Sequence, residues 1–375
     1  MKIVVYFKSL FHLRKIFMLA VAVIMSILSI QAQRIEVVDA DGYGIPLVSV
    51  LTEDGILIGT TDLNGVLVDV EGATNMTLTH VAYKPQVVDV ASLQDGRITM
   101  ENVDFNLNEV VVKPKPYFYV EYYFRAFSYI DDSLRVYTAG IIPVGHEIQN
   151  KYNGKTHGVW SFGGAANKAL TWNTQDLADI AEQGAKTAAS PIETALRADQ
   201  RYKDYYKISV EPDGENRWLI RNPEEVLGHI TYDDGLSLTT LDAGRSQIYA
   251  KKVNGEEKNA QRREERNYTY QYMEVFKLDE EGKVQRENFV MELDHWEYDT
   301  KKGKRITIIY LYAADKGYMD EDEFKARRKE LNKGHSGDMS LDELVEYERT
   351  HNIPPIAPIQ QKAIQGLTKQ TGKKK

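Results

Sequence analysis

The sequence contains no cysteine among its 375 residues. Without a thiol, the chain cannot form disulfides, thiolate metal sites or cysteine nucleophiles. A bacterial lipoprotein anchor is also excluded, because its acylation requires a cysteine. An excess of basic charge is missing too, since the formal net charge is −8. An acidic chain argues against nucleic acid as the main partner, because phosphate binding requires a basic surface.

Residues 1–32 have the pattern of a signal peptide. Four basic residues precede an apolar run at 16–30, and Ala32 occupies a suitable cleavage position. The run is shorter than the ~20 residues that cross a bilayer, so we expect cleavage rather than retention as an anchor. Loss of these four positive charges changes the net charge from −8 to −12. We therefore expect an exported protein, periplasmic or associated with the outer membrane, with no transmembrane span in its mature chain.

Residues 33–112 alternate short apolar stretches with turn sequences. The pair Asn64-Gly65 is a strong turn signal because both residues tolerate positive φ. Turns that recur about every 8 to 12 residues are typical of an antiparallel β-sandwich.

Four motifs in this region carry a resemblance to a known family. They are Val37-Val38-Asp39 with Gly44-Ile45-Pro46-Leu47, Gly59-Thr60-Thr61-Asp62-Leu63-Asn64-Gly65, His80-Val81-Ala82-Tyr83, and Leu107-Asn108-Glu109-Val110-Val111-Val112. Together they resemble the carboxypeptidase regulatory-like family, in the version found in envelope proteins of Bacteroidota. The resemblance implies a seven-stranded, transthyretin-like sandwich that serves as an accessory module and not as a catalytic one.

Residues 113–116 alternate lysine and proline, which predicts a stiff linker between two domains. Longer, aromatic-rich strands follow, with turn sequences at 131–133, 212–216 and 279–282. Ser190-Pro191 followed by Glu193 is a good helix start, which predicts a helical insertion near 174–203. Residues 117–318 are therefore expected to form a sheet-rich α+β domain.

The tail, residues 319–375, is polar. Asp320 with Glu323 and Ser340 with Glu343 each predict a helix start, and the second helix should end near Thr350. The remainder is expected to be disordered. The predicted fold is thus mainly β: an N-terminal sandwich, a larger sheet-rich domain, and a short helical, partly disordered tail.

Patterns of catalytic or metal-binding residues are weak throughout. No two histidines stand four residues apart, and Asp62 and Asn64 lack the remaining oxygens of a calcium loop. Ser336 has a neighbouring histidine but no preceding strand. The remaining candidates are the carboxylates of predicted hairpin turns: Asp131, Asp132, Asp233 and Asp234. We therefore assign no catalytic residue, no metal site and no cofactor from the sequence.

Aromatic residues concentrate in the first strand of the second domain, on both of its faces. One face is expected to pack against a core, and the other to line a groove or contact surface. The residues assigned to that surface are Tyr119, Tyr123 and Phe127.

These observations favour an exported, non-catalytic cell-envelope protein. The sandwich would act as an adaptor, and the second domain as a binding or assembly surface for an envelope protein or a small amphiphilic or glycan ligand. The alternative is a hydrolase of glycans or peptides in the same compartment. Its reactive groups would have to converge from segments 146–156, 228–235 and 294–298.

Overall fold

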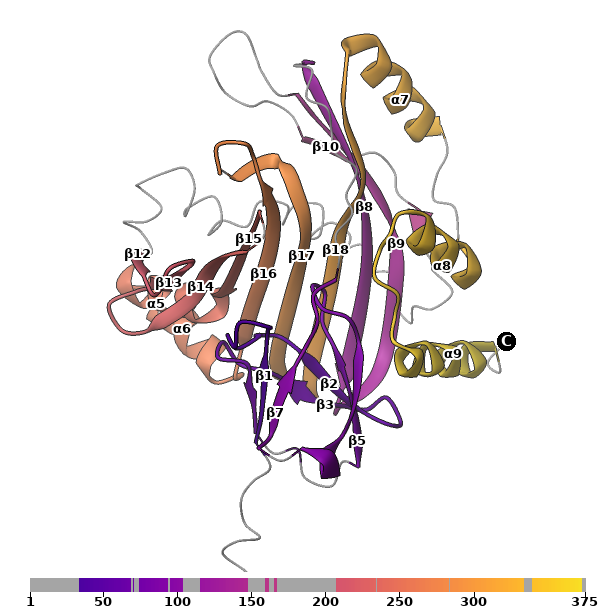
Figure 1. The fold of residues 1–375 in the computed structure, drawn as a ribbon. Helices are drawn as coiled ribbons and strands as arrows, with labels where there is room; N and C mark the ends of the chain where they lie inside the picture. The colour runs from indigo at the N-terminus through magenta and orange to yellow at the C-terminus, as the bar shows by residue number, and fades with distance from the viewer. Residues whose placement is uncertain are drawn as a thin grey trace, which may run out of the picture.

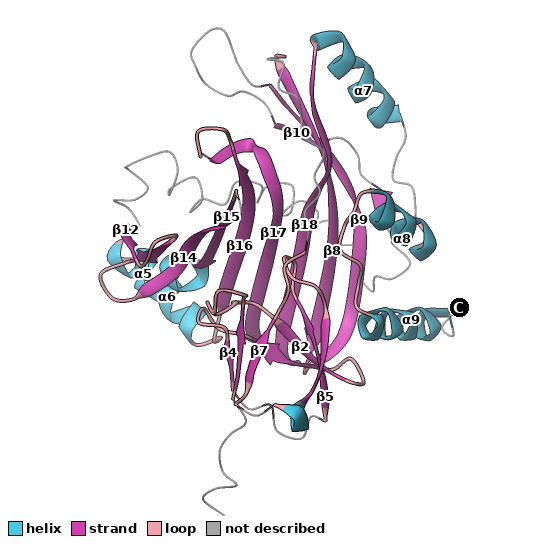
Figure 2. Cartoon of the chain, viewed as in Figure 1, coloured by secondary structure: helices cyan, strands magenta, loops and turns pink. Residues whose placement is uncertain are grey.

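A computed structural model describes residues 34–68, 70, 74–93, 95–103, 115–147, 159–161, 165–166, 207–233, 235–282, 284–333 and 339–372. The predicted signal peptide, the motif at 107–112 and the helical insertion near 174–203 lie outside the described residues. The fold is mainly β, with several sheets and a short helical C-terminus (Figures 1 and 2).

The N-terminal residues form two small sheets, and we refer to residues 34–103 as the N-terminal module. One sheet has the strand order β4-β1-β7 and the other β3-β2-β5-β6. The strands are β1 Ile35–Val38, β2 Ser49–Thr52, β3 Leu57–Thr60, β4 Val66–Leu67, β5 Asn75–Thr79, β6 Gln86–Asp89 and β7 Arg97–Thr99. Gly65 precedes β4 with a φ of 76°, and a Cβ there would overlap the carbonyl oxygen of Val37. This predicted turn therefore requires glycine.

An 11-stranded antiparallel sheet forms the largest part of the molecule (Figure 1). Its main path is β10-β9-β8-β18-β17-β16-β15-β14-β13-β12, and β11 pairs with β9. The strands are β8 Tyr117–Ile130, β9 Ser133–Glu147, β10 Val159–Ser161, β11 Ala165–Ala166, β12 Ser209–Pro212, β13 Arg217–Arg221, β14 Val226–Asp233, β15 Leu236–Asp242, β16 Thr269–Leu278, β17 Val284–Thr300 and β18 Gly303–Met319.

The described helices are α5 Ala243–Val253, α6 Glu257–Glu264, α7 Glu321–Lys333, α8 Leu341–Thr350 and α9 Pro358–Gly372, with a short 3-10 turn at Val90–Ser92. The capping box predicted for Ser340 and Glu343 is confirmed at the start of α8. The expectation of disorder after Thr350 is wrong for α9, because Ile364 and Leu367 bury their side chains in the core. None of the described helices is long and apolar enough to cross a membrane.

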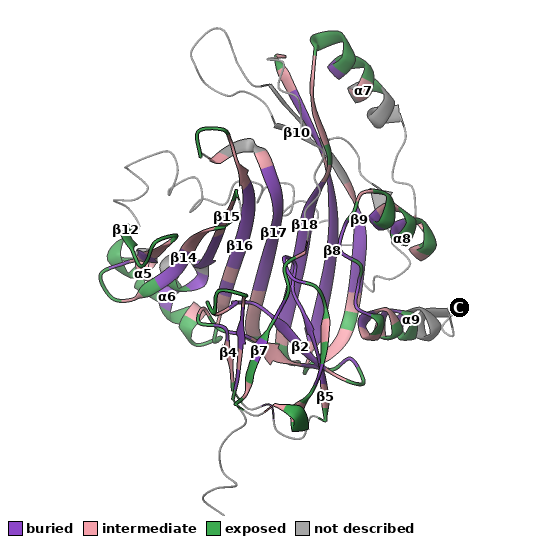
Figure 3. Cartoon of the chain, viewed as in Figure 1, coloured by how far each residue is buried: buried purple, intermediate pink, exposed green. Residues whose placement is uncertain are grey.

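One hydrophobic core joins the module, the large sheet and the C-terminal helices. We define the inner face of the sheet as the one that carries Tyr123, Phe127 and Met273; these side chains share a core with Leu57 of the module and Leu344 of α8. In Figure 3 the strands of the large sheet that lie behind the module are predominantly buried. The two predicted domains thus pack against each other, because apolar surfaces of both parts are removed from water together.

A buried ion pair attaches the C-terminal segment to the inner face. Arg125 and Glu348 are 5% and 4% exposed, and Nη1 of the arginine lies 3.2 Å from Oε1 of the glutamate. The same Oε1 accepts a hydrogen bond of 2.6 Å from the hydroxyl of Tyr123. Arg125 also donates to the carbonyl of Pro354 at 2.9 Å and to the hydroxyl of Tyr312 at 3.0 Å. Both charges are thus compensated, as burial requires.

Candidate functional site

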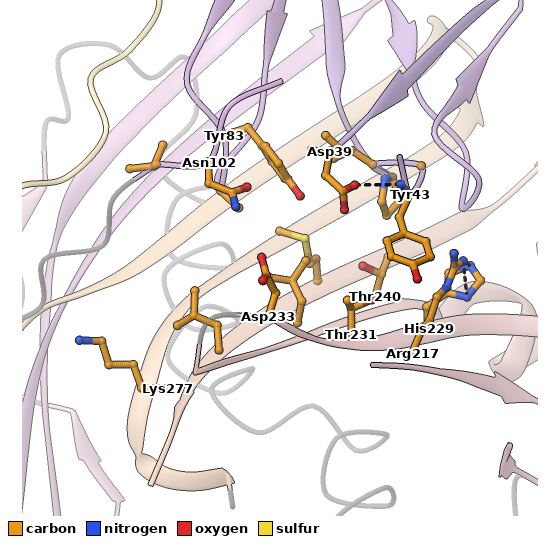
Figure 4. A pocket seen from close by; sticks show the side chains of 18 residues that line it. Asp39, Tyr43, Tyr83, Asn102, Arg217, His229, Thr231, Asp233, Thr240 and Lys277 are labelled. Carbon is orange, nitrogen blue, oxygen red and sulfur yellow. Dashed lines mark hydrogen bonds between the residues drawn. The ribbon is translucent and has the colours of Figure 1, made fainter. Parts of the chain in front are cut away.

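A cavity of about 520 Å³ lies between the N-terminal module and the inner face of the large sheet (Figure 4). The module contributes polar side chains that include Asp39, Tyr83 and Asn102. Strands β13 to β16 contribute the opposite wall. Its polar residues are Arg217, His229, Thr231, Asp233, Thr240 and Lys277.

Apolar side chains complete the lining. Ile45 and Ala82 belong to the module, whereas Leu236, Leu238 and Met273 project from β15 and β16. Small-molecule sites in proteins commonly combine an apolar lining with a few polar groups that orient the ligand. This cavity has both kinds of group on facing walls.

Asp39 holds its position through a local turn. Its Oδ1 accepts hydrogen bonds from the backbone N–H groups of Asp41 and Tyr43, at 3.0 and 2.8 Å. Aspartate favours such turns because its short side chain reaches the backbone two to four residues ahead. Burial raises the pKa of Asp39, and the backbone hydrogen bonds oppose that rise.

Arg217 and His229 interact on the sheet side of the cavity. Nη2 of the guanidinium lies 3.0 Å from Nδ1 of the imidazole, and Nε lies 3.4 Å from a carboxylate oxygen of Asp213. The guanidinium also lies over the ring of Tyr43, 5.4 Å from its centroid. Burial, together with the charge of Arg217, lowers the pKa of His229 to about 4. The imidazole is therefore neutral at pH 7, and it is a weak base.

The segments proposed for a hydrolase do not converge within the described residues. Segment 228–235 supplies His229, Thr231 and Asp233 to the cavity. In segment 294–298, Asp294 accepts a hydrogen bond of 2.7 Å from the hydroxyl of Tyr270, on the opposite face of the sheet from the module. Residues 148–156 of the remaining segment lie outside the described residues.

The aromatic residues expected to form a contact surface are buried. Tyr119, Tyr123 and Phe127 are 2%, 0% and 1% exposed. Phe127 packs against the ring of Tyr310, with ring centroids 5.9 Å apart, and Tyr119 donates a hydrogen bond of 2.9 Å to Glu121. In this structure the three side chains contact the chain itself.

The turn carboxylates considered for catalysis are divided between two places. Asp131 and Asp132 form the β8–β9 turn with φ values of 45° and 63°, whereas Asp233 lines the cavity. Asp234 lies outside the described residues. Within the part of the chain that the structure describes, no three histidine, aspartate or glutamate side chains form a group that could hold a metal ion.

Neither a family model nor a curated protein matches the sequence. Among solved structures, one described as "Lipid-protein interactions in lipovitellin" is similar over 54% of this chain and 25% of that chain. The two have 8% sequence identity and a TM-score of 0.24. A likeness this low carries no argument about fold or function.

Proposed function

We propose that this chain is an exported, non-catalytic cell-envelope protein that binds a small amphiphilic ligand in the cavity between the N-terminal module and the large sheet. The observation that carries the proposal is the lining of this cavity, which places apolar side chains such as Leu238 and Met273 beside Asp39, Tyr83 and Asp233. An amphiphile could bury its apolar part there and satisfy the polar groups at the same time.

In this proposal the N-terminal module is a transthyretin-like sandwich whose role is to form one wall of the binding site. Its seven strands in two small sheets are compatible with that family's architecture. The module packs against the large sheet, and the backbone N–H of Leu57 donates to the carbonyl of Asp132 at 2.9 Å. A docked module of this kind would bring binding residues to the sheet while it also serves as an adaptor.

Filling the cavity tests the proposal. Leu238 is partly buried on the cavity wall, so Leu238→Trp should occupy the space that the ligand needs. Val87→Trp is the matched control, because Val87 is 70% exposed on β6. We expect native mass spectrometry to detect a bound small molecule on wild type and on Val87→Trp after incubation with an envelope lipid extract, and not on Leu238→Trp. Absence of bound mass on the wild-type protein would contradict the proposal.

The alternative, a hydrolase, has one observation in its favour. His229, Asp39 and Asp233 line the same cavity, and a histidine with two carboxylates can perform acid–base chemistry. The lowered pKa of His229 and its interaction with Arg217 favour binding instead. Turnover of a glycan or peptide by the wild-type protein, lost in His229→Gln, would establish the alternative.

A further inference from the structure

Tyr83 presents a polar group to the cavity that the protein itself does not satisfy. The side chain is 6% exposed, and its ring packs against His80 with centroids 5.1 Å apart. Figure 4 shows the phenol directed into the cavity, toward the wall that carries Asp233. Among the described residues, the hydroxyl has no hydrogen-bond partner. The hydroxyl is open to the cavity, so a ligand group that forms a hydrogen bond with it would gain affinity.

The surroundings of that hydroxyl are negatively charged. Asp39 lies on the module side and Asp233 on the sheet side, so the two carboxylates approach the cavity from facing walls (Figure 4). Burial and the charges of Asp39, Asp233 and Asp41 together raise the pKa of Tyr83. Within the described residues, neither Asp39 nor Asp233 forms an ion pair. The carboxylate charges in the cavity are therefore not neutralised locally.

The cations of the lining are directed elsewhere. Arg217 is held by Asp213 and His229 and covers the ring of Tyr43. Lys277 extends along the wall with its ammonium group pointing away from the other labelled side chains (Figure 4). The part of the cavity next to Tyr83 thus offers two carboxylates and a hydroxyl. This combination is suited to a cation, because the carboxylates supply negative charge and all three groups can accept hydrogen bonds.

We infer that the cavity binds an amphiphile with a cationic amine, whose nitrogen lies between Asp39, Asp233 and the Tyr83 hydroxyl and whose apolar part contacts Leu236, Leu238 and Met273. This inference rests on the proposed function and specifies the class of ligand. A primary ammonium group has three donors, one for each of the three oxygen-bearing side chains.

Three ten-carbon probes that differ only in their head group test the inference. We would titrate decylammonium, decanoate and decanol into the full mature chain at pH 7 and measure the affinities by calorimetry. Decylammonium should bind at least about tenfold more tightly than decanoate or decanol, because charge-assisted hydrogen bonds are the stronger ones. Decanoate should bind most weakly, because it meets like charges.

Aspartate to asparagine substitutions, which remove the negative charge and nearly keep the size of the side chain, complete the test. Asp39→Asn keeps the side-chain oxygen that accepts the two backbone N–H groups of the turn, and Asp233→Asn alters a residue at the exposed end of β14. Each should lower the affinity for decylammonium about tenfold and leave that for decanol unchanged. Asp95→Asn is the control, since Asp95 is an exposed aspartate of the same module whose Oδ1 accepts from the N–H of Arg97 at 3.1 Å.

The outcomes separate this inference from the proposed function. If none of the three probes binds, both fail. The inference of a cationic amine also fails if decanoate or decanol binds as tightly as decylammonium. It fails equally if both asparagine variants bind decylammonium as wild type does. In either case the cavity is still a binding site, and the proposed function stands. Spermidine, an amine without a long apolar chain, distinguishes two kinds of ligand. Weak binding of spermidine indicates a lipid-like amine. Binding as tight as that of decylammonium indicates a soluble polyamine, and the inferred apolar part of the ligand is then refuted.

Discussion

Acid should weaken the folded protein through His295, which lies on β17 beneath the N-terminal module. The side chain is 2% exposed, and its Nε2 is 3.5 Å from Oγ1 of Thr60 in the module. Burial, with a smaller contribution from the charge of Lys304, lowers the pKa of His295 from 6.5 to about 4. Because the folded-state pKa lies below the unfolded value, the stabilising contribution is present above pH ~6.5 and is lost as the pH falls toward 4.

The magnitude follows from the two pKa values. One pKa unit corresponds to about 1.4 kcal/mol, so the full loss is about 3 kcal/mol, of which about 2 kcal/mol occurs between pH 7.5 and pH 5. Asp242 and Asp294 act in the opposite direction, because burial raises the pKa of each to about 6. Protonation of these two aspartates in acid favours the folded state. The pH dependence of the wild-type protein alone therefore does not give the contribution of His295.

Comparison with His295→Gln isolates the contribution of His295, because the two aspartates contribute equally to both proteins. We would measure the free energy of unfolding in urea by tryptophan fluorescence, at pH 7.5 and at pH 5.0. The packing cost of the substitution is read at pH 7.5. Between the two pH values, wild type should lose about 2 kcal/mol more than the variant. Equal losses in the two proteins would show that the buried imidazole is not kept neutral by the fold, and the reasoning would be refuted.

Three further predictions concern the stability of the fold. Glu348→Gln leaves the charge of Arg125 buried without a counter-ion, and urea unfolding should show a loss of about 3 to 5 kcal/mol, much of it recovered when Arg125→Met and Glu348→Leu are combined. Gly228→Ala would drive a Cβ into the carbonyl oxygen of Thr240 and separate β14 from β15, so we expect a lower melting temperature and no ligand binding in the cavity. Ser340→Ala removes the N-cap of α8 and should cost about 1 kcal/mol in the same urea assay, whereas Ser340→Asp retains the cap.

Local features of the fold could be predicted from the sequence. The hairpin expected at 131–133 is present, since β8 ends at Ile130 and β9 begins at Ser133. Asp131 and Asp132 both have positive φ, which aspartate tolerates better than most residues. Turns and helix caps depend on residues that are near one another in the chain, and for that reason their sequence patterns are informative.

The cavity and the C-terminal packing could not be predicted in this way. Tyr83 lies between β5 and β6 of the module, whereas His229 lies on β14 of the large sheet. No sequence pattern predicts which surface of the module contacts which strands. Helix α6 has a mostly polar sequence, and α9 contains Gly366, which lowers its intrinsic helix preference. The helix α9 is stabilised instead by tertiary contacts of Ile364 and Leu367, which override a weak local preference. Asp39 and Tyr83 fall within recognisable motifs, but those motifs indicate turns rather than a binding site.

The contact between the module and α9 has a consequence for biogenesis. A Cβ built on Gly55 would lie 3.4 Å from Ala363, so residues near the two ends of the chain become neighbours. Because the chain is synthesised from its amino end, the apolar side chains of the module that pack near α9 stay exposed to water until α9 has been made. Contacts between residues so far apart in the chain form slowly, and the exposed apolar surface of the module is prone to self-association in the meantime. Removal of α8 and α9 should therefore yield insoluble protein, even though no described residue of either helix lines the cavity.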